Sequence, residues 1–230
     1  MLVDLSCSLG LAAGVALGTP LWLARPRKVR DAALARLVRV YARGGLSPNR
    51  ISATSLALAA LAGGAFALGH FGLGALVVAV AASCAAVVRS TGAETSSRAV
   101  LEATIDRYGE FVILLGMAIH VRHDALDLGL VELAMLGSFM VSYASAKGAA
   151  FGVDEPRGRR AERSVWLIGG AALVPLTRAV LPVAGENVVK LPLLVALALV
   201  GMLAYGSAIR HFAEIGRVAA RANTALRAPK

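Results

Sequence analysis

The chain has 230 residues, of which 57% are hydrophobic and only 17% are charged. Its two cysteines both lie in apolar runs, which excludes a disulfide framework. Apolar runs of about 20 residues recur along the whole chain, long enough to cross a hydrocarbon core of about 30 Å. The segments between them are too short for a soluble domain. The net charge of +10 does not indicate nucleic-acid binding, because the basic residues gather in alternate connecting segments.

The first 45 residues predict two segments that precede the core. The stretch at 2–24 is apolar apart from Asp4 and Pro20, and it lacks the basic start of a signal peptide. We interpret it as an extra N-terminal span that starts outside, with a hairpin or an interfacial segment as the alternatives. Residues 28–45 alternate apolar side chains with arginines at helical spacing, which predicts an amphipathic helix on the membrane surface.

Six apolar runs predict the core of the protein. They are Ile51–Ala67, Phe71–Val88, Val100–His120, Ala125–Ala146, Val165–Ala184 and Leu191–Ile209. Because helices satisfy their own backbone in lipid, we expect an all-α polytopic membrane bundle with six core transmembrane helices. This core occupies residues 46–215, between an N-terminal part at 1–45 (an apolar segment at 1–27, then the surface helix) and a basic tail at 216–230. Pro48 marks the start of the first core helix.

The basic residues predict how the bundle is oriented. All but four of the 24 lysines and arginines fall on one side of this arrangement. The exceptions are Arg107, Arg122, Arg178 and Lys190. By the positive-inside rule, the basic loops and the C-terminus lie in the cytoplasm, and the protein is integral to the cytoplasmic membrane. Basic loops at that surface also attract anionic lipid headgroups, by about 1 kcal/mol for each residue. The expected partners are therefore membrane lipids and not nucleic acid.

Ionisable residues within the third apolar run are the first candidates for a site. Arg98, Glu102, Asp106 and Glu110 follow one another at intervals of four, so they share one face of a helix. Two carboxylates one turn apart can share a divalent cation, or one can act as a general base. The same spacing also lets Arg98 pair with Glu102 without any metal. The helix alone leaves both interpretations open.

Short groups of residues along the core have a characteristic order and spacing. They are Leu46-Ser47-Pro48-Asn49-Arg50-Ile51-Ser52, Ser142-Tyr143, Lys147, Arg160-Ala161-Glu162-Arg163, Ser207 and Arg210. In that order they resemble the opening of the first core helix, the end of the fourth helix with its following loop, and the closing helix of the CDP-alcohol phosphatidyltransferases. The resemblance implies that family's six-helix fold and homodimers. It also implies its reaction, transfer of a phosphatidyl group from a CDP-linked lipid to an alcohol with release of CMP.

The family's motif is D-x-x-D-G-x-x-A-R, then eight residues, then G-x-x-x-D-x-x-x-D. In the family its four aspartates hold two divalent metals, and the last is thought to be the base. Anchored on this sequence, the motif keeps its arginine as Arg89 and its last aspartate as Asp106, and the third aspartate falls on Glu102. The other positions depart from the motif: Ala81, Cys84, Ala85, Val88 and Arg98.

These departures change the chemistry that the resemblance implies. Alanine has no ligand atom and a thiol is a poor ligand for magnesium, so only Glu102 and Asp106 are left as metal ligands. No cofactor is therefore expected, or Mg²⁺ or Mn²⁺ if the chain is active with Asp106 as its base. The family binds phosphate through basic side chains, which makes five residues candidates for nucleotide or phosphate binding: Arg89, Arg98, Lys147, Arg160 and Arg163.

Two hypotheses on function follow from the altered motif, and whether the chain is an enzyme stays open between them. In the first, the chain has lost the two-metal transfer and acts in phospholipid biosynthesis as a lipid-binding protein or as a partner subunit, in a homodimer or with an active relative. In the second, it remains a transferase with an altered site, in which Arg98 supplies missing positive charge. A transporter is a weaker third class, because it would need polar residues on several helices near the midplane.

Overall fold

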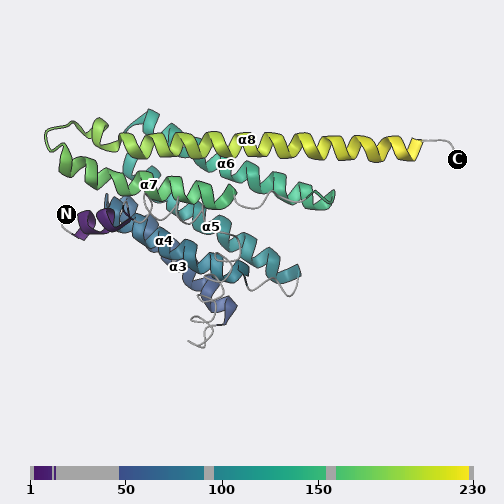
Figure 1. Cartoon of the computed structure of the whole chain (residues 1–230), viewed down its shortest axis with the longest axis horizontal. Coiled ribbons are helices and arrows are strands. Elements are labelled where there is room, and N and C mark those ends of the chain that lie inside the picture. Colours follow the sequence, from purple (N-terminus) through teal and green to yellow (C-terminus); the bar gives the residue numbers. More distant parts are fainter. Residues whose placement is uncertain (1–2, 12, 14–46, 91–95, 154–158, 228–230) are drawn as a thin grey trace.

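The computed structural model describes residues 3–11, 13, 47–90, 96–153 and 159–227. Within these ranges the side chains at 48, 89–90, 96–99, 159–162 and 222–227 are outside the description. Six long helices follow one another (Figure 1): α3 Pro48–Ala67, α4 Phe71–Ser90, α5 Ser96–Val121, α6 Ala125–Ala150, α7 Arg159–Val180 and α8 Glu186–Arg227. The described part of the chain contains no strand, so the predicted all-α class is confirmed.

The six helices coincide with the six predicted spans. Four of the described helices are long and apolar enough to cross a membrane, with the qualifying segments Asn49–Ala67, Phe71–Val88, Ala125–Ala150 and Glu186–Arg221. Helices α5 and α7 are not among the four, and both carry charged residues along their length. Helix α8 runs without a break past residue 215, where the sequence predicted a basic tail, and it extends beyond the rest of the bundle in Figure 1.

Local chemistry explains where the first core helix begins and ends. The side chain of Ser47 accepts a hydrogen bond from the backbone N–H of Arg50, and Pro48 occupies the first turn, where its missing N–H costs nothing. At the other end, Gly69 adopts a φ of 82°, which lets the N–H of His70 reach the carbonyl of Ala65 at 2.8 Å. The observed start of α3 at Pro48 confirms the predicted start of the first core helix.

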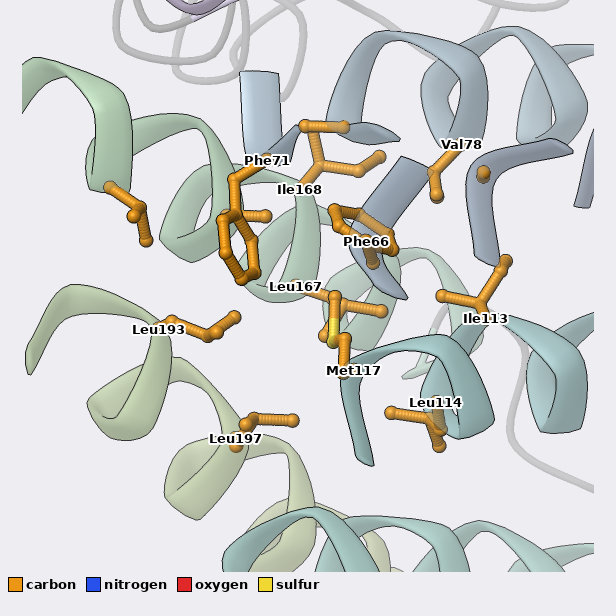
Figure 2. Packing of buried hydrophobic residues seen from close by; sticks show 14 of the residues in the cluster. Phe66, Phe71, Val78, Ile113, Leu114, Met117, Leu167, Ile168, Leu193 and Leu197 are labelled. Carbon is orange, nitrogen blue, oxygen red and sulfur yellow. The ribbon is translucent and has the colours of Figure 1, made fainter. Parts of the chain in front are cut away.

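One apolar cluster forms the centre of the bundle. Helix α6 packs on α8, α3 packs on α4 and α5, and α7 packs on α8 and α4. Side chains from all six helices meet in this cluster, and Figure 2 shows part of it. Its largest fully buried members include Phe66, Leu114, Met117, Leu193 and Leu197. The helices are therefore joined by close packing between their side chains.

Helices α3 and α5 cross with their backbones in contact. A Cβ atom placed on Gly116 would lie 2.7 Å from the Cα of Gly63 and closer still to the carbonyl oxygen of that residue. A Cβ on Gly63 would in turn collide with the backbone of Val112. Only glycine fits at this crossing, because any side chain would force the two helices apart.

The N-terminal helical segment at residues 3–11 docks on the start of α4. The Asp4 carboxylate accepts a hydrogen bond from the backbone N–H of Leu73 at 2.9 Å, across 69 residues of sequence. Ser8 is fully buried, and Leu11 packs against the central cluster. The other parts of the predicted N-terminal span, together with the predicted surface helix at 28–45, lie outside the described residues.

Asp4 therefore acts as an N-cap supplied by another helix, and its removal has a measurable cost. Asp4→Ala leaves an N–H in the first turn of α4 without its acceptor, and we expect a loss of about 1 kcal/mol of stability. Denaturant titration in detergent micelles measures this. Ser6→Ala is the control, because its hydroxyl donates to the Val3 carbonyl within the same segment. Equal effects of the two substitutions would contradict the capping role.

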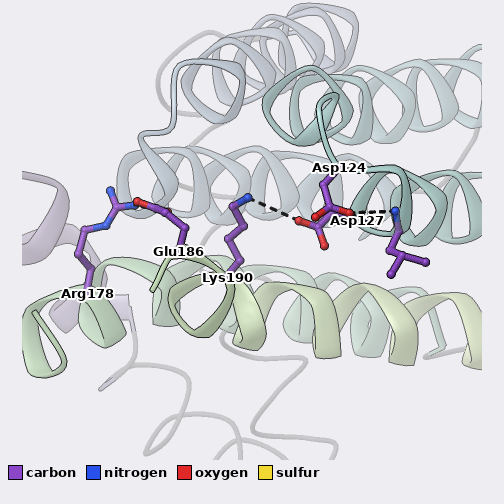
Figure 3. Close-up of polar contacts among 6 residues, drawn as sticks. Asp124, Asp127, Arg178, Glu186 and Lys190 are labelled. Atoms are coloured by element: carbon purple, nitrogen blue, oxygen red, sulfur yellow. Dashed lines mark hydrogen bonds and ion pairs between the residues drawn. The ribbon is translucent and has the colours of Figure 1, made fainter. Parts of the chain in front are cut away.

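Polar contacts tie the other helices together at the same end of the bundle (Figure 3). Asp124 caps α6 by accepting hydrogen bonds from the N–H groups of Leu126 and Asp127. Lys190 on α8 lies 3.6 Å from the buried carboxylate of Asp127, which joins α8 to α6. Arg178 and Glu186 pair at 2.7 Å across the turn between α7 and α8. At this end of the bundle, the charged side chains named here are used in a helix cap and in two ion pairs that join neighbouring helices.

Candidate functional site

A cavity of about 370 Å³ lies on the side of the central cluster toward the ends of α4 and the starts of α5 and α7. Five helices form its walls. Its lining includes Ser55 and Ala59 from α3, Val78, Ala81, Ala82, Ser83, Ala85 and Ala86 from α4, Ile105, Asp106, Arg107, Gly109, Glu110, Ile113 and Leu114 from α5, Arg163, Ser164, Val165, Leu167 and Ile168 from α7, and Val200 from α8. The volume is near the lower end of the range for small-molecule pockets, about 300–1,000 Å³.

The motif positions on α4 divide between the cavity and the packing behind it. Ala81 and Ala85 line the cavity. Cys84 is buried at 3% exposure, and it belongs to a separate apolar cluster with Ile51 and Val88. Two positions that carry a metal ligand and a glycine in the family pattern therefore present methyl groups here. The α4 wall is small and apolar apart from Ser83.

The α5 wall carries the acidic groups of the cavity. Asp106 and Glu110 both line it, one turn apart. Glu102 is half-buried and does not belong to the lining, so the carboxylate beside Asp106 in the cavity is Glu110, and the predicted pair with Glu102 is not brought together there. The helical spacing placed all three on one face, but it could not say where along that face the cavity begins.

Arg107 is a site residue that sequence reasoning missed. Its Nη1 donates to Glu110 Oε2 at 2.8 Å and to Ser138 Oγ at 3.1 Å, which links α5 to α6. The arginine and the glutamate are both partly buried. The sequence contained a signal for this pair, because Arg107 and Glu110 are three residues apart and are therefore neighbours on the surface of a helix. This pairing neutralises one of the two carboxylates that line the cavity.

Arg163 is the buried cation of the site. It lies one turn into α7, lines the cavity and is 6% exposed. Its Nη1 atom is buried and has no hydrogen-bond partner among the residues that the structure describes. A buried guanidinium nitrogen without a partner costs about 1–3 kcal/mol or more. An anion in the cavity would satisfy this nitrogen.

Of the other four predicted phosphate-binding residues, Lys147 is the one whose side chain the structure describes. Lys147 is exposed at the end of α6, where its Nζ lies 5.9 Å from the ring centroid of Tyr143. That contact fits a surface cation–π pair. Arg89, Arg98 and Arg160 lie on α4, α5 and α7, and their side chains are outside the description.

The donor atoms near the cavity do not fit the family's two-metal site. The α4 positions supply a methyl group at Ala81 and a buried thiol at Cys84, a residue that packs with Ile51 and Val88. Divalent magnesium requires several hard oxygen ligands. In the described parts of the chain, no three His, Cys, Asp or Glu side chains form a group that could hold a metal ion.

Two known proteins are similar to parts of this chain. Over 109 residues it is 35% identical to the bifunctional IPC transferase and DIPP synthase of Rubrobacter xylanophilus, covering 46% of this chain and 25% of that protein. Over 125 residues it is 31% identical to the archaetidylinositol phosphate synthase of Pyrococcus horikoshii, covering 52% of this chain and 64% of that protein. The chain thus spans less than two thirds of either relative. No protein-family model matches it.

Solved structures with the same fold come from Mycobacterium tuberculosis phosphatidylinositol phosphate synthase. The complex with manganese and citrate has a TM-score of 0.63 at 21% identity and covers 79% of this chain and 88% of that one. The structure with CDP-DAG bound has a TM-score of 0.62 at 22% identity, with coverage of 79% and 92%. At such identities the likeness shows the fold alone.

Helices of membrane-spanning length and this shared fold define the class: an integral membrane protein built as an α-helical bundle. Within that class, the similarity to the curated relatives agrees with the order of the short sequence groups in the core. The fold and these partial similarities agree with the resemblance of the core to the CDP-alcohol phosphatidyltransferases.

Proposed function

We propose that this protein binds a phosphate-bearing lipid group in its cavity and does not carry out the family's usual two-metal transfer. The observation that carries the proposal is the composition of the cavity wall. Ala81 and Ala85 line it where the family pattern has an aspartate and a glycine, while the buried Arg163 lines the same space. In this proposal Arg163 binds the anion, and the α4 wall supplies no carboxylate to hold a metal.

Electrostatics supports this division of roles. An arginine presents planar, bidentate donors that match phosphate geometry, and burial strengthens that interaction. Glu110 is neutralised by Arg107 at 2.8 Å, so it does not oppose an anion in the cavity at full strength. Without carboxylates on α4, by contrast, nothing on that wall can compensate the charge of two divalent cations.

The names of the similar proteins indicate which ligands to try first. They describe synthases of inositol phosphate lipids, and one solved relative holds CDP-DAG. We therefore propose a phospholipid or its phosphorylated headgroup as the ligand class, with the site opening toward the cytoplasm as the basic loops predict. In this role the chain acts as a lipid-binding subunit, as a homodimer or beside an active relative.

An altered transferase is the second candidate, and Asp106 favours it. This residue keeps the position of the family's presumed base and lines the same cavity as Arg163. A carboxylate can accept the proton of an attacking hydroxyl, and an arginine can stabilise phosphoryl charge as the nucleotide leaves. Such a reaction would require the Asp106 carboxylate, which makes the two candidates separable by experiment.

The test is release of CMP by the purified full chain in lipid nanodiscs. The assay contains CDP-diacylglycerol, Mg²⁺ or Mn²⁺, and a panel of acceptors that includes inositol phosphate and glycerol phosphate. We expect no release above the rate of empty nanodiscs with any acceptor, because the α4 wall supplies no metal ligand. The Mycobacterium tuberculosis synthase, assayed alongside, shows that the conditions support turnover.

Asp106→Asn serves as the matched variant, because it keeps the shape of the side chain and removes its basicity. Metal-dependent CMP release that disappears in this variant would overturn the proposal and establish the altered transferase. A cooperative thermal unfolding transition of each sample shows that an inactive protein is folded.

A further inference from the structure

The cavity is polar at one end and apolar at the other. On α5, Asp106 and Glu110 are followed by Ile113 and Leu114, and on α7 Arg163 and Ser164 are followed by Leu167 and Ile168. Eight residues separate Asp106 from Leu114, which is about 12 Å along a helix. The change from charged to apolar lining occurs on both helices in the same direction.

Helix α3 shows the same gradient, because Ser55 lines the cavity one turn before Ala59. Helix α4 lines the cavity with Val78 and with small residues, of which Ser83 is the polar one. Val78, Ile113 and Ile168 also belong to the central cluster, and Figure 2 labels all three. The apolar end of the cavity is therefore the hydrophobic core itself, and the charged end lies nearer the start of α7.

We infer that this cavity holds a single-chain anionic amphiphile, with a phosphate or carboxylate head on Arg163 and its tail against Val78, Ile113 and Ile168. The inference rests on the proposed function and specifies its ligand. The observation behind the head is the buried Nη1 of Arg163, which lacks a partner among the described residues. The observation behind the tail is the apolar end of the same cavity.

The lining favours a chain over a nucleotide. Recognition of a base uses aromatic stacking and convergent hydrogen-bond donors, and the lining contains no aromatic residue among the described side chains. The α4 wall is instead mostly alanine, a smooth surface against which methylene groups gain dispersion contacts. Burial of apolar area stabilises such a chain by about 25 cal/mol per Å².

Photo-crosslinking tests the inference with a dodecyl phosphate that carries a diazirine near the end of its tail. The full chain is labelled in phosphatidylcholine nanodiscs, and the modified peptides are mapped by mass spectrometry. We expect labels on α5 and α7 at 113–114 and 167–168. Arg163→Gln should lower this labelling at least tenfold, because the head loses its partner. Val78→Phe should also lower it at least tenfold, because the ring fills the space of the tail.

Two control variants match these substitutions on the same helices. Arg178→Gln removes an exposed arginine of α7 that is paired with Glu186, and Val80→Phe enlarges a side chain of α4 that is 43% exposed. Both should keep the labelling of the unmodified protein. Ala59→Leu provides a second way to fill the apolar end if Val78→Phe does not fold.

The outcomes separate this inference from the proposed function. Labels confined to exposed positions such as Leu115, or labelling that survives both Arg163→Gln and filling of the apolar end, would overturn the amphiphile. Displacement of the probe by an equal concentration of inorganic phosphate would also overturn it, since the tail would then contribute nothing. The crosslinking experiment does not measure CMP release. The CMP assay therefore decides separately whether the chain is a phosphate-binding protein without transferase activity.

Discussion

Gly116→Ala is expected to lower the stability of the bundle by about 2–3 kcal/mol, a large effect for one methyl group. The new Cβ would lie 2.6 Å from the carbonyl carbon of Gly63, and that neighbour is backbone. A flexible side chain could turn away from the methyl group, but a helix backbone has to move as a whole. Helices α3 and α5 would separate, and the cavity that both of them line would widen.

The measurement is denaturant unfolding in micelles, followed by tryptophan fluorescence or circular dichroism. Gly64→Ala is the matched control on α3, because a Cβ there meets nothing within 4 Å. It should be neutral or stabilising by up to about 1 kcal/mol, the difference in helix propensity. If both substitutions changed the stability equally, the backbone contact between α3 and α5 would not be the cause.

Arg107→Met is expected to cost about 2–4 kcal/mol, because it leaves the Glu110 carboxylate partly buried without its cation. The hydroxyl of Ser138 on α6 loses a donor at the same time. The double substitution Arg107→Met and Glu110→Met should recover most of the loss, since two apolar side chains then replace an ion pair. Unfolding titrations of the two single variants and the double variant give the coupling between the residues.

Arg178 supplies the comparison for this prediction. Its pair with Glu186 is closer, at 2.7 Å, but the two side chains are 54% and 65% exposed. Arg178→Met should therefore cost less than about 1 kcal/mol, as for other surface ion pairs. A loss from Arg178→Met as large as that from Arg107→Met would show that burial does not set the strength of these pairs.

Part of the site could be predicted from the family motif that the sequence resembles. The motif alignment singled out Ala81, Ala85 and Asp106, and the structure places all three on one cavity. Arg163 was one of five basic candidates, and nothing in the sequence distinguished it from Lys147, which the structure places on an exposed face. Which cation is buried depends on the neighbouring helices, and local sequence does not contain that information.

The positions of Glu102, Cys84 and Glu110 show the limit of the motif. Glu102 and Cys84 are motif positions that do not line the cavity, whereas Glu110 lies outside the motif and lines it. The cavity begins where five helices stop packing tightly, so its extent along α5 is a property of the assembled bundle. The polar-to-apolar gradient is likewise visible only when α3, α5 and α7 are seen together.

The sequence by itself determined the six core helices, because apolar runs of membrane-spanning length and capping residues such as Ser47 act locally. It also carries the resemblance to the CDP-alcohol phosphatidyltransferases, through the order of short groups along the core. Only the tertiary structure decided that Gly63 and Gly116 meet, that Asp4 caps a helix 69 residues away, and that Arg163 is buried beside an apolar cavity. These features join residues far apart in sequence, and they exist only once the helices have packed.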